Sequence, residues 1–152
     1  MLKVLEAIWQ QIEETYEAID ISIGSAGSRI GWKPDGDIST FAEIAQHIAS
    51  ANLSYCTVIG PENVRRIWQI EASPEIGVLL GRLKDSLSIV QNTFERVTLD
   101  NLHDCRCDDW SPNCDEQNIQ GPLDTLWFAL QILRHTAYHL GQLNSYLQLM
   151  HA

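Results

Sequence analysis

The 152-residue sequence predicts an all-α protein, a four-helix bundle with long connections. Four long stretches carry apolar residues at helical steps of three and four, and no stretch alternates as a half-buried strand does. Glycine and proline separate these stretches where helices would have to end. No repeat, linker or change in composition divides the chain, so we expect a single domain over residues 1–152.

The first helix is predicted from about Leu2 to Asp20. Its apolar residues recur at helical spacing: Leu5, Ile8, Trp9, Ile12, Tyr16 and Ile19. The segment "IGSAGSRIGWKPDGD" follows, and its glycines and Pro34 predict a loop. Within this loop, Trp32 is expected to pin the segment to the bundle.

The second helix is predicted in "STFAEIAQHIASANLSYCTVI", where Thr40 and Glu43 form a capping-box pattern. One side of the helix is mainly apolar: Phe41, Ile44, Ile48, Ala51, Tyr55 and Val58. Gly60 and Pro61 end the helix. Cys56 lies within the helical pattern and is expected to pack as a small apolar residue.

The third helix is predicted to start with Ser73 as N-cap and Pro74 at the first helical position. The clearest apolar stripe of the chain follows: Ile76, Leu80, Leu83, Leu87, Val90, Phe94 and Val97. These residues alternate steps of four and three, as in a heptad pattern. This periodicity predicts a helix that packs along one face.

The fourth helix is predicted from about Leu123 to Met150, after Gly121-Pro122, and it carries two apolar stripes. One stripe contains Leu123, Leu126, Leu130, Leu133 and Ala137. The other contains Phe128, Ile132, Leu143, Tyr146 and Met150, together with His135 and His139. A surface helix needs only one buried face. We therefore expect a central helix, or a homodimer that buries the additional face.

The formal charge of −10 argues against nucleic acid as a partner, because phosphate contacts need a basic surface. The same charge disfavours anionic membranes, and no apolar run approaches the ~20 residues of a membrane span. The N-terminal stretch contains scattered acids and does not have the pattern of a signal peptide. We expect a cytoplasmic protein with small molecules, metals or proteins as partners.

Three histidines fall on helical stripes that are predicted to face the core. His135 and His139 are four residues apart, so their rings can converge on one point, and His47 lies on the apolar side of the second helix. Three imidazoles from two helices would suit Zn²⁺, Ni²⁺ or Fe²⁺, with open positions for water. The alternative, three separately satisfied core histidines, is less economical. Thr136 replaces the glutamate of the metalloprotease motif, so that motif is absent.

The segments "GWKPDGDISTFAEIAQHIASA" and "LRHTAYHLGQL" resemble the DinB/YfiT family of four-helix-bundle metalloenzymes. The resemblance implies that His47, His135 and His139 bind a divalent metal, zinc or nickel, with iron or manganese as alternatives. It also implies a thiol-dependent transferase or isomerase that uses bacillithiol, mycothiol or glutathione, and a homodimer. Leu140 departs from the family, whose members often carry arginine there, and this weakens any assignment of the substrate by analogy.

The function expected from the histidines is that of a divalent-metal-dependent enzyme acting on a small molecule, and the resemblance implies a thiol-dependent S-transferase or isomerase. A non-catalytic protein that binds a metal or small ligand is the alternative, and a pure interaction protein is a third class. Glu43 could orient His47 or merely complete the capping box, Tyr146 could line the pocket or belong to the core, and Gln142 could reach the site or solvent.

The remaining cysteines cluster in one loop with His103. Cys105, Cys107 and Cys114 could ligate a structural zinc or form a disulfide or redox-active pair. Their spacing lacks the paired C-x₂-C units of well-attested zinc sites. We therefore expect ordinary loop thiols.

Overall fold

The computed structural model describes residues 1–60, 70–71, 74–104 and 123–152. These residues form four α-helices, one short 3₁₀-helix and no strand, which confirms the all-α prediction. The elements in chain order are α1 (Lys3–Ala26), η1 (Gly27–Arg29), α2 (Phe41–Ile59), α3 (Ile76–Glu95) and α4 (Thr125–His151).

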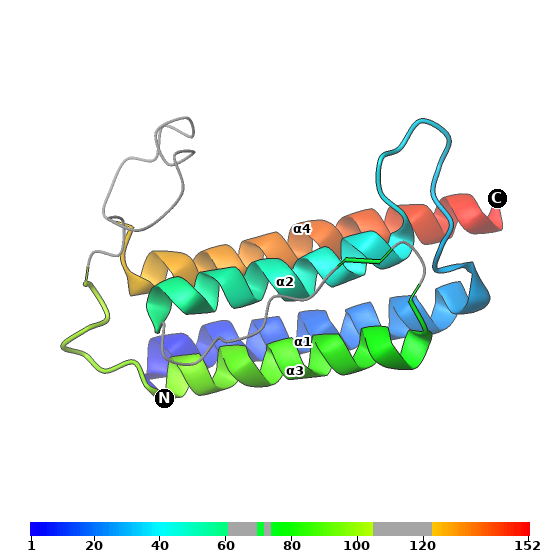
Figure 1. Ribbon diagram of the computed structural model, residues 1–152. Coiled ribbons are helices and arrows are strands. Elements are labelled where there is room, and N and C mark those ends of the chain that lie inside the picture. The colour runs from blue at the N-terminus through cyan, green and yellow to red at the C-terminus, as the bar shows by residue number, and fades with distance from the viewer. Residues whose placement is uncertain (61–69, 72–73, 105–122) are drawn as a thin grey trace.

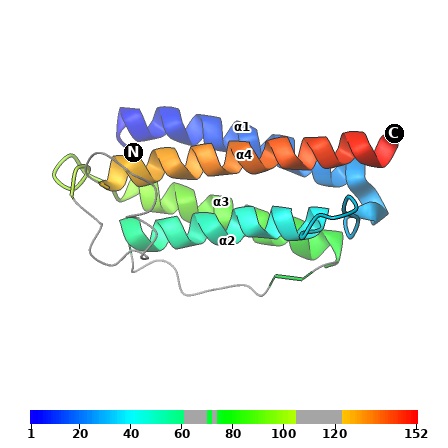
Figure 2. The ribbon, with the colours of Figure 1, turned by 90° about the horizontal axis from the view of Figure 1, so that it is seen from above.

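The four helices pack side by side as a bundle (Figures 1 and 2). Each of α1 and α2 packs against both α3 and α4, so α1 lies diagonally opposite α2. Helices α1 and α4 run in one direction, and α2 and α3 run in the other (Figure 1). Because the neighbours α2 and α3 are parallel, a tight turn cannot join them. This topology explains the long connections that the sequence predicted.

One hydrophobic core runs along the bundle and receives side chains from all four helices. Its largest fully buried members are Leu5, Ile12, Ile19, Ile23, Phe41, Ile48, Leu79, Leu83, Phe94, Phe128, Ile132 and Leu143. Cys56 is also buried and is a free thiol, as predicted. Among the described helices, none has both the length and the apolar character needed to cross a membrane.

Helix α1 is longer than predicted, because it ends at Ala26 and not near Asp20. Ile23 is fully buried and Ala26 nearly so. Burying an isoleucine side chain contributes about 2 kcal/mol, which outweighs the ~1 kcal/mol cost of Gly24 inside a helix. The C-cap residue is Gly27, whose φ of 54° lies in the left-handed region that glycine tolerates.

Helix α2 begins at the predicted capping box. The backbone N–H of Glu43 donates to Thr40 Oγ1 over 3.2 Å, and the backbone N–H of Thr40 donates to Glu43 Oε2 over 2.7 Å. These two bonds satisfy donors that have no intrahelical partner. The helix ends before Gly60, as predicted. The position of His47 on α2 therefore follows from a local sequence signal.

Helix α3 differs from the prediction at its start and in its buried face. It begins at Ile76, with Glu75 rather than Ser73 in the N-cap position; Ser73 itself lies outside the described residues. Leu79, which is absent from the predicted stripe, is fully buried, whereas Leu80 and Leu87 are only half-buried. The other members of the predicted stripe that reach the core are Leu83, Val90, Phe94 and Val97, all of which are buried. The prediction is therefore confirmed for most of the stripe, and Leu80 and Leu87 lie at its margin.

Helix α4 begins at Thr125, and its N-cap Asp124 accepts a hydrogen bond from the backbone N–H of Trp127 over 2.8 Å. The stripe with Phe128, Ile132, Leu143 and Tyr146 is buried. The opposite stripe is only partly covered. Leu123 is buried and Leu126 and Leu133 are half-buried, whereas Leu130 is 49% exposed and Ala137 is exposed. A single copy of the chain thus leaves part of the second apolar face of α4 uncovered.

Candidate metal centre

The three histidines meet between α2 and α4. Nε2 of His135 lies 3.1 Å from Nε2 of His47 and 3.0 Å from Nε2 of His139. One ring nitrogen from each residue lies within 4.8 Å of the other two. The one-turn spacing in α4 supplies two of the rings, and the packing of α2 against α4 supplies the third.

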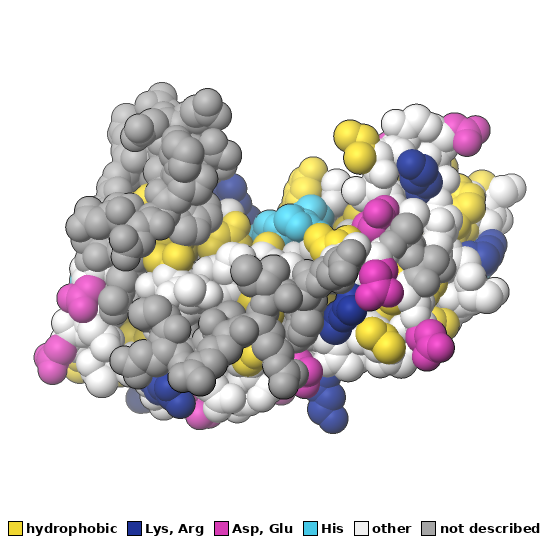
Figure 3. Space-filling view, viewed as in Figure 1, with side chains coloured by type: hydrophobic (Ala, Val, Ile, Leu, Met, Phe, Trp, Pro, Cys, Tyr) yellow, Lys and Arg dark blue, Asp and Glu magenta, His cyan; other side chains and the backbone are white. Residues whose placement is uncertain are grey.

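The histidines lie at the margin of the bundle and not in its core, which corrects the predicted placement. His47 is exposed, and His135 and His139 are half-buried. Figure 3 shows the histidine side chains at the surface, in a hollow. The reason is the rotation of about 100° per residue along a helix. Ile48 is fully buried on α2, so the preceding His47 points toward the edge of the interface.

Two of the three separations between the nitrogens, those from His135 to His47 and to His139, fit a shared ion. Two nitrogens that each lie ~2.1 Å from an ion are ~3.0 Å apart at a right angle and ~3.4 Å apart at the tetrahedral angle. The observed 3.0 and 3.1 Å favour angles near 90°. An ion held by three imidazoles would keep its other coordination positions open for water or a small molecule. The group could therefore hold a metal ion.

Gln142 determines which nitrogen of His139 carries the proton. Nδ1 of His139 lies 2.6 Å from Gln142 Oε1, an oxygen that can only accept. The amide nitrogen of Gln142 donates to the hydroxyl of Tyr138 over 3.3 Å, which is consistent with this orientation of the amide. Nδ1 is thus the donor, and the lone pair on Nε2 points toward the other two rings, as a metal ligand requires.

All three imidazoles favour the neutral form. Burial lowers the pKa of His47. Burial, together with the proximity of His139 and His47, lowers the pKa of His135 to about 3. Burial also lowers the pKa of His139, although its hydrogen bond to Gln142 acts in the opposite direction. Neutral imidazole is the form that ligates metals, so the site is prepared for an ion at neutral pH.

A cavity of about 570 Å³ opens beside the histidines. It is bounded by the loop that precedes α2, by the first half of α2 and by the second half of α4. Its lining consists of Gly36, Asp37, Ile38, Ser39, Glu43, Ile44, His47, His139, Gln142 and Tyr146. A concave surface with a few convergent polar groups is the usual form of a small-molecule site.

The structure places all three of the weaker site candidates on this cavity. Glu43 forms the capping box, and its Oε2 accepts from the backbone of Thr40. Tyr146 is buried and also lines the cavity, so both interpretations of this residue hold. Of the two alternatives for Gln142, the structure shows the side chain reaching the site, because it is hydrogen-bonded to His139.

Sequence reasoning missed Asp37. The hydroxyl of Tyr146 donates to Asp37 Oδ2 over 2.7 Å, and the carbonyl of Ser39 is a second acceptor at 3.2 Å. Burial and the nearby Asp37 carboxylate raise the pKa of Tyr146 to about 12, so the phenol stays a donor. The Pro-Asp-Gly-Asp stretch before the His47 helix gave a turn signal only.

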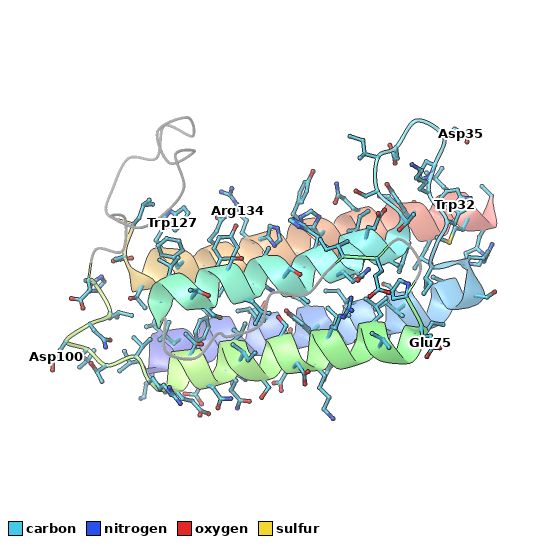
Figure 4. The ribbon with its side chains drawn as sticks, in the orientation of Figure 1. Trp32, Asp35, Glu75, Asp100, Trp127 and Arg134 are labelled. Carbon is cyan, nitrogen blue, oxygen red and sulfur yellow. The ribbon has the colours of Figure 1, made fainter. Side chains whose placement is uncertain are left out.

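The Trp32 ring packs edge-on against Tyr146, with centroids 5.9 Å apart, and the backbone N–H of Phe41 donates to the carbonyl of Trp32 over 3.0 Å. Trp32 thus pins the loop to the bundle, as predicted. Gly36 makes the turn at a φ of 88°. Figure 4 shows this loop above the end of α4, with Trp32 and Asp35 labelled.

Two other sequence features lie apart from the cavity. Leu140 is half-buried and packs against the core, and it is not part of the lining. Cys105, Cys107 and Cys114 lie outside the described residues. His103, which was grouped with them, has its Nδ1 2.7 Å from Asp124 Oδ2 at the start of α4.

The model of a family described as the DinB superfamily matches residues 5–143. The match includes all three histidines and almost the whole bundle. Neither the curated proteins nor the solved structures contain a significant match to the chain.

Proposed function

The chain belongs to the DinB superfamily, and from this membership we propose that it is a divalent-metal protein acting on a small molecule. The observation that carries the proposal is the convergence of three histidine nitrogens beside an open cavity. His47, His135 and His139 would hold the ion, and zinc or nickel are the metals we favour. Iron and manganese are the alternatives.

The reaction that we propose is a transfer or isomerisation that uses a low-molecular-weight thiol. A bound divalent ion would supply Lewis acidity and favour the thiolate form of a ligated thiol. The residues of the chain itself would orient the metal-binding histidines and shape the cavity for the small molecule. Gln142 sets the tautomer of His139, Tyr146 and Trp32 hold the loop, and the cavity admits a small molecule next to the histidines.

A non-catalytic role in binding a metal or small ligand is the second candidate. One observation favours it. The Glu43 carboxylate accepts from the backbone of the capping box and does not contact a histidine in the described structure. Among the residues that the structure describes, no carboxylate is hydrogen-bonded to a histidine of the group, so none of these residues is placed there as a general base.

The cellular compartment and the oligomeric state that the sequence predicts, cytoplasm and homodimer, remain part of the proposal. The free buried thiol of Cys56 is compatible with a reducing compartment, and we propose the cytoplasm. We also propose a homodimer, supported by the partly exposed apolar face of α4.

Metal content of protein purified without a histidine tag tests the ligands. We expect about one divalent ion per chain, and a large loss of metal in each of His47→Ala, His135→Ala and His139→Ala. His151→Ala is the matched control, since this histidine lies near the end of α4 and outside the group. Full metal retention in all three single variants would exclude the proposed ligands.

A thiol titration of the cobalt-substituted protein separates the two candidate functions. A thiolate-to-cobalt charge-transfer band that grows with added thiol is expected for the transferase. No spectral response to any small thiol, with cobalt still bound, would favour the non-catalytic alternative.

A further inference from the structure

The cavity beside the histidines is acidic. Its lining contains two carboxylates, Asp37 and Glu43, and no lysine or arginine among the described residues that form it. The two acids come from different segments, one from the loop and the other from the first turn of α2. The charge of the cavity is therefore built from two parts of the fold that converge on the same space.

Both carboxylates keep unused acceptor capacity. Asp37 accepts from the hydroxyl of Tyr146, and Glu43 accepts from the backbone N–H of Thr40. A carboxylate has about four acceptor sites, so each can take further donors. The ion pairs of the described structure, Arg82–Glu71 and His103–Asp124, involve neither of them.

In the described structure, no lysine or arginine forms an ion pair with either acid. The ammonium of Lys33 donates to the carbonyl of Ile38 over 3.3 Å, so its charge lies beside the cavity, although Lys33 is not part of the lining. Arg134 adjoins His135 in sequence, yet its side chain points away from the bundle (Figure 4) and does not line the cavity. A ligand that enters the cavity thus meets negative charge without a compensating lysine or arginine in the described lining.

We propose that the cavity binds a small molecule that carries a protonated amine, and that it discriminates against molecules that carry a carboxylate at the same place. This inference rests on the proposed function, in which the reactive end of the molecule reaches the histidines. The ammonium pairs with Asp37, whose carboxylate is held by Tyr146, and Glu43 adds to the negative potential. Like charge in the cavity disfavours a carboxylate.

Three small thiols that differ in charge test this inference: cysteamine, 2-mercaptoethanol and 3-mercaptopropionate. The affinity of each is measured from the charge-transfer band of the cobalt-loaded protein, and the ratio of the cysteamine to the 3-mercaptopropionate affinity is compared between variants. The thiols differ in their own acidity, but this difference is the same for every variant. The change in the ratio therefore isolates the contribution of the protein.

We expect Asp37→Asn to reduce the affinity ratio about 3- to 10-fold, the effect of one partly exposed ion pair together with the lost repulsion of the carboxylate. Asp35→Asn is the matched control, because it removes the same charge from the same loop at a position outside the lining, and its ratio should stay unchanged. An equal ratio in the parent protein and Asp37→Asn would overturn the inference while leaving metal and thiol binding intact.

Cobalt uptake by the parent protein distinguishes a failure of the proposed metal site from a failure of the charge preference. A parent protein that takes up no cobalt contradicts the metal site, and the charge preference is then read from the metal-free protein by NMR titration with the same thiols. Larger shifts of the Tyr146 and Gln142 signals with cysteamine than with 3-mercaptopropionate support the acidic cavity. Equal shifts with the two compounds overturn it.

Discussion

Gln142 shows how a single side chain can influence metal binding at the site. Its carbonyl oxygen accepts from His139 Nδ1 over 2.6 Å and so directs the Nε2 lone pair toward the other histidines. The residues that hydrogen-bond a metal ligand commonly affect metal affinity nearly as strongly as the ligands do. Gln142 is therefore a positioning residue whose effect should be visible in metal binding alone.

Replacing Gln142 by alanine should lower the metal affinity about 10- to 100-fold, because His139 loses the acceptor that fixes its tautomer. Gln142→Glu retains an acceptor at the same distance and should bind metal at least as well as the parent protein. Competition with a chromophoric chelator measures both affinities. An equal loss in Gln142→Glu, which keeps both the size and the acceptor, would contradict the acceptor role of Gln142.

His135 should make the metal-free protein sensitive to acid. Its pKa is near 3 in the folded protein and near 6.5 in an unfolded chain. Between these values the unfolded chain binds more protons, so the free energy of unfolding falls as the pH decreases through this window. Stability should be retained above about pH 6.5.

Urea unfolding of chelator-treated protein at pH 7.5 and pH 5 measures this sensitivity. His135→Gln should lose less stability between the two pH values than the parent protein does. His151→Gln, which alters an exposed histidine outside the site, should follow the parent. If His135→Gln were as acid-sensitive as the parent, burial of a neutral His135 would not be the cause.

The capping box of α2 shows how an element places a functional residue. Thr40 and Glu43 satisfy each other's backbone N–H groups and define the first turn, seven residues before His47. Thr40→Ala should destabilise the protein by about 1 kcal/mol, the usual cost of losing a side-chain cap. Denaturant unfolding measures the change.

Thr98→Ala is a suitable control for this cap, because Thr98 is exposed and lies outside the helices. It should change the free energy of unfolding by less than about 0.5 kcal/mol. A comparable loss in the two variants would mean that the capping bonds contribute nothing specific to α2.

A buried polar network ties all four helices together at the level of the whole molecule. The hydroxyl of Tyr16 lies 3.0 Å from Ser86 Oγ and accepts from Asn52 Nδ2 over 2.8 Å. The Asn52 amide also donates to Thr136 Oγ1 over 2.9 Å, next to His135 in the chain. One residue of the network comes from each helix, so the network favours a single register of the bundle.

Tyr16→Phe removes the central hydroxyl and leaves a buried amide N–H of Asn52 without its acceptor, which should cost about 1–3 kcal/mol. Burial raises the pKa of Tyr16 to about 12, so the hydroxyl is neutral throughout the working pH range. Tyr138→Phe, at a side chain that is 63% exposed, should have little effect on stability. A similar small effect of both substitutions, measured in urea, would contradict a stabilising network.

The partly exposed apolar face of α4 is the surface on which we expect two copies of the chain to associate. Leu130 is 49% exposed, and Leu126 and Leu133 are half-buried along the same side. The homodimer proposed from this stripe should dissociate in Leu130→Glu, which places a charge in the apolar face, and sedimentation at micromolar concentration measures the change. A monomeric parent protein would exclude the dimer.

Local signals were sufficient for much of the site. The i,i+4 spacing puts His135 and His139 on one side of any helix that contains them, and the capping box starts α2 at a defined residue. The glycine signal after Asp20 was misleading, because burial of Ile23 extends α1 beyond it. A local preference against helix is overridden where burial of a side chain in the tertiary structure stabilises the helix by more than the preference costs.

The sequence by itself determined the helical class, the capped start of α2 and the one-turn spacing of His135 and His139, because these depend on patterns within single segments. The packing of α2 against α4 brings His47 to them. Only the tertiary structure decided that the histidines lie at the surface margin, and that Asp37 and Tyr146 meet in a cavity beside them. The physical reason is that a side chain's burial and partners depend on how distant segments pack, and no local periodicity encodes the rotation of one helix against another.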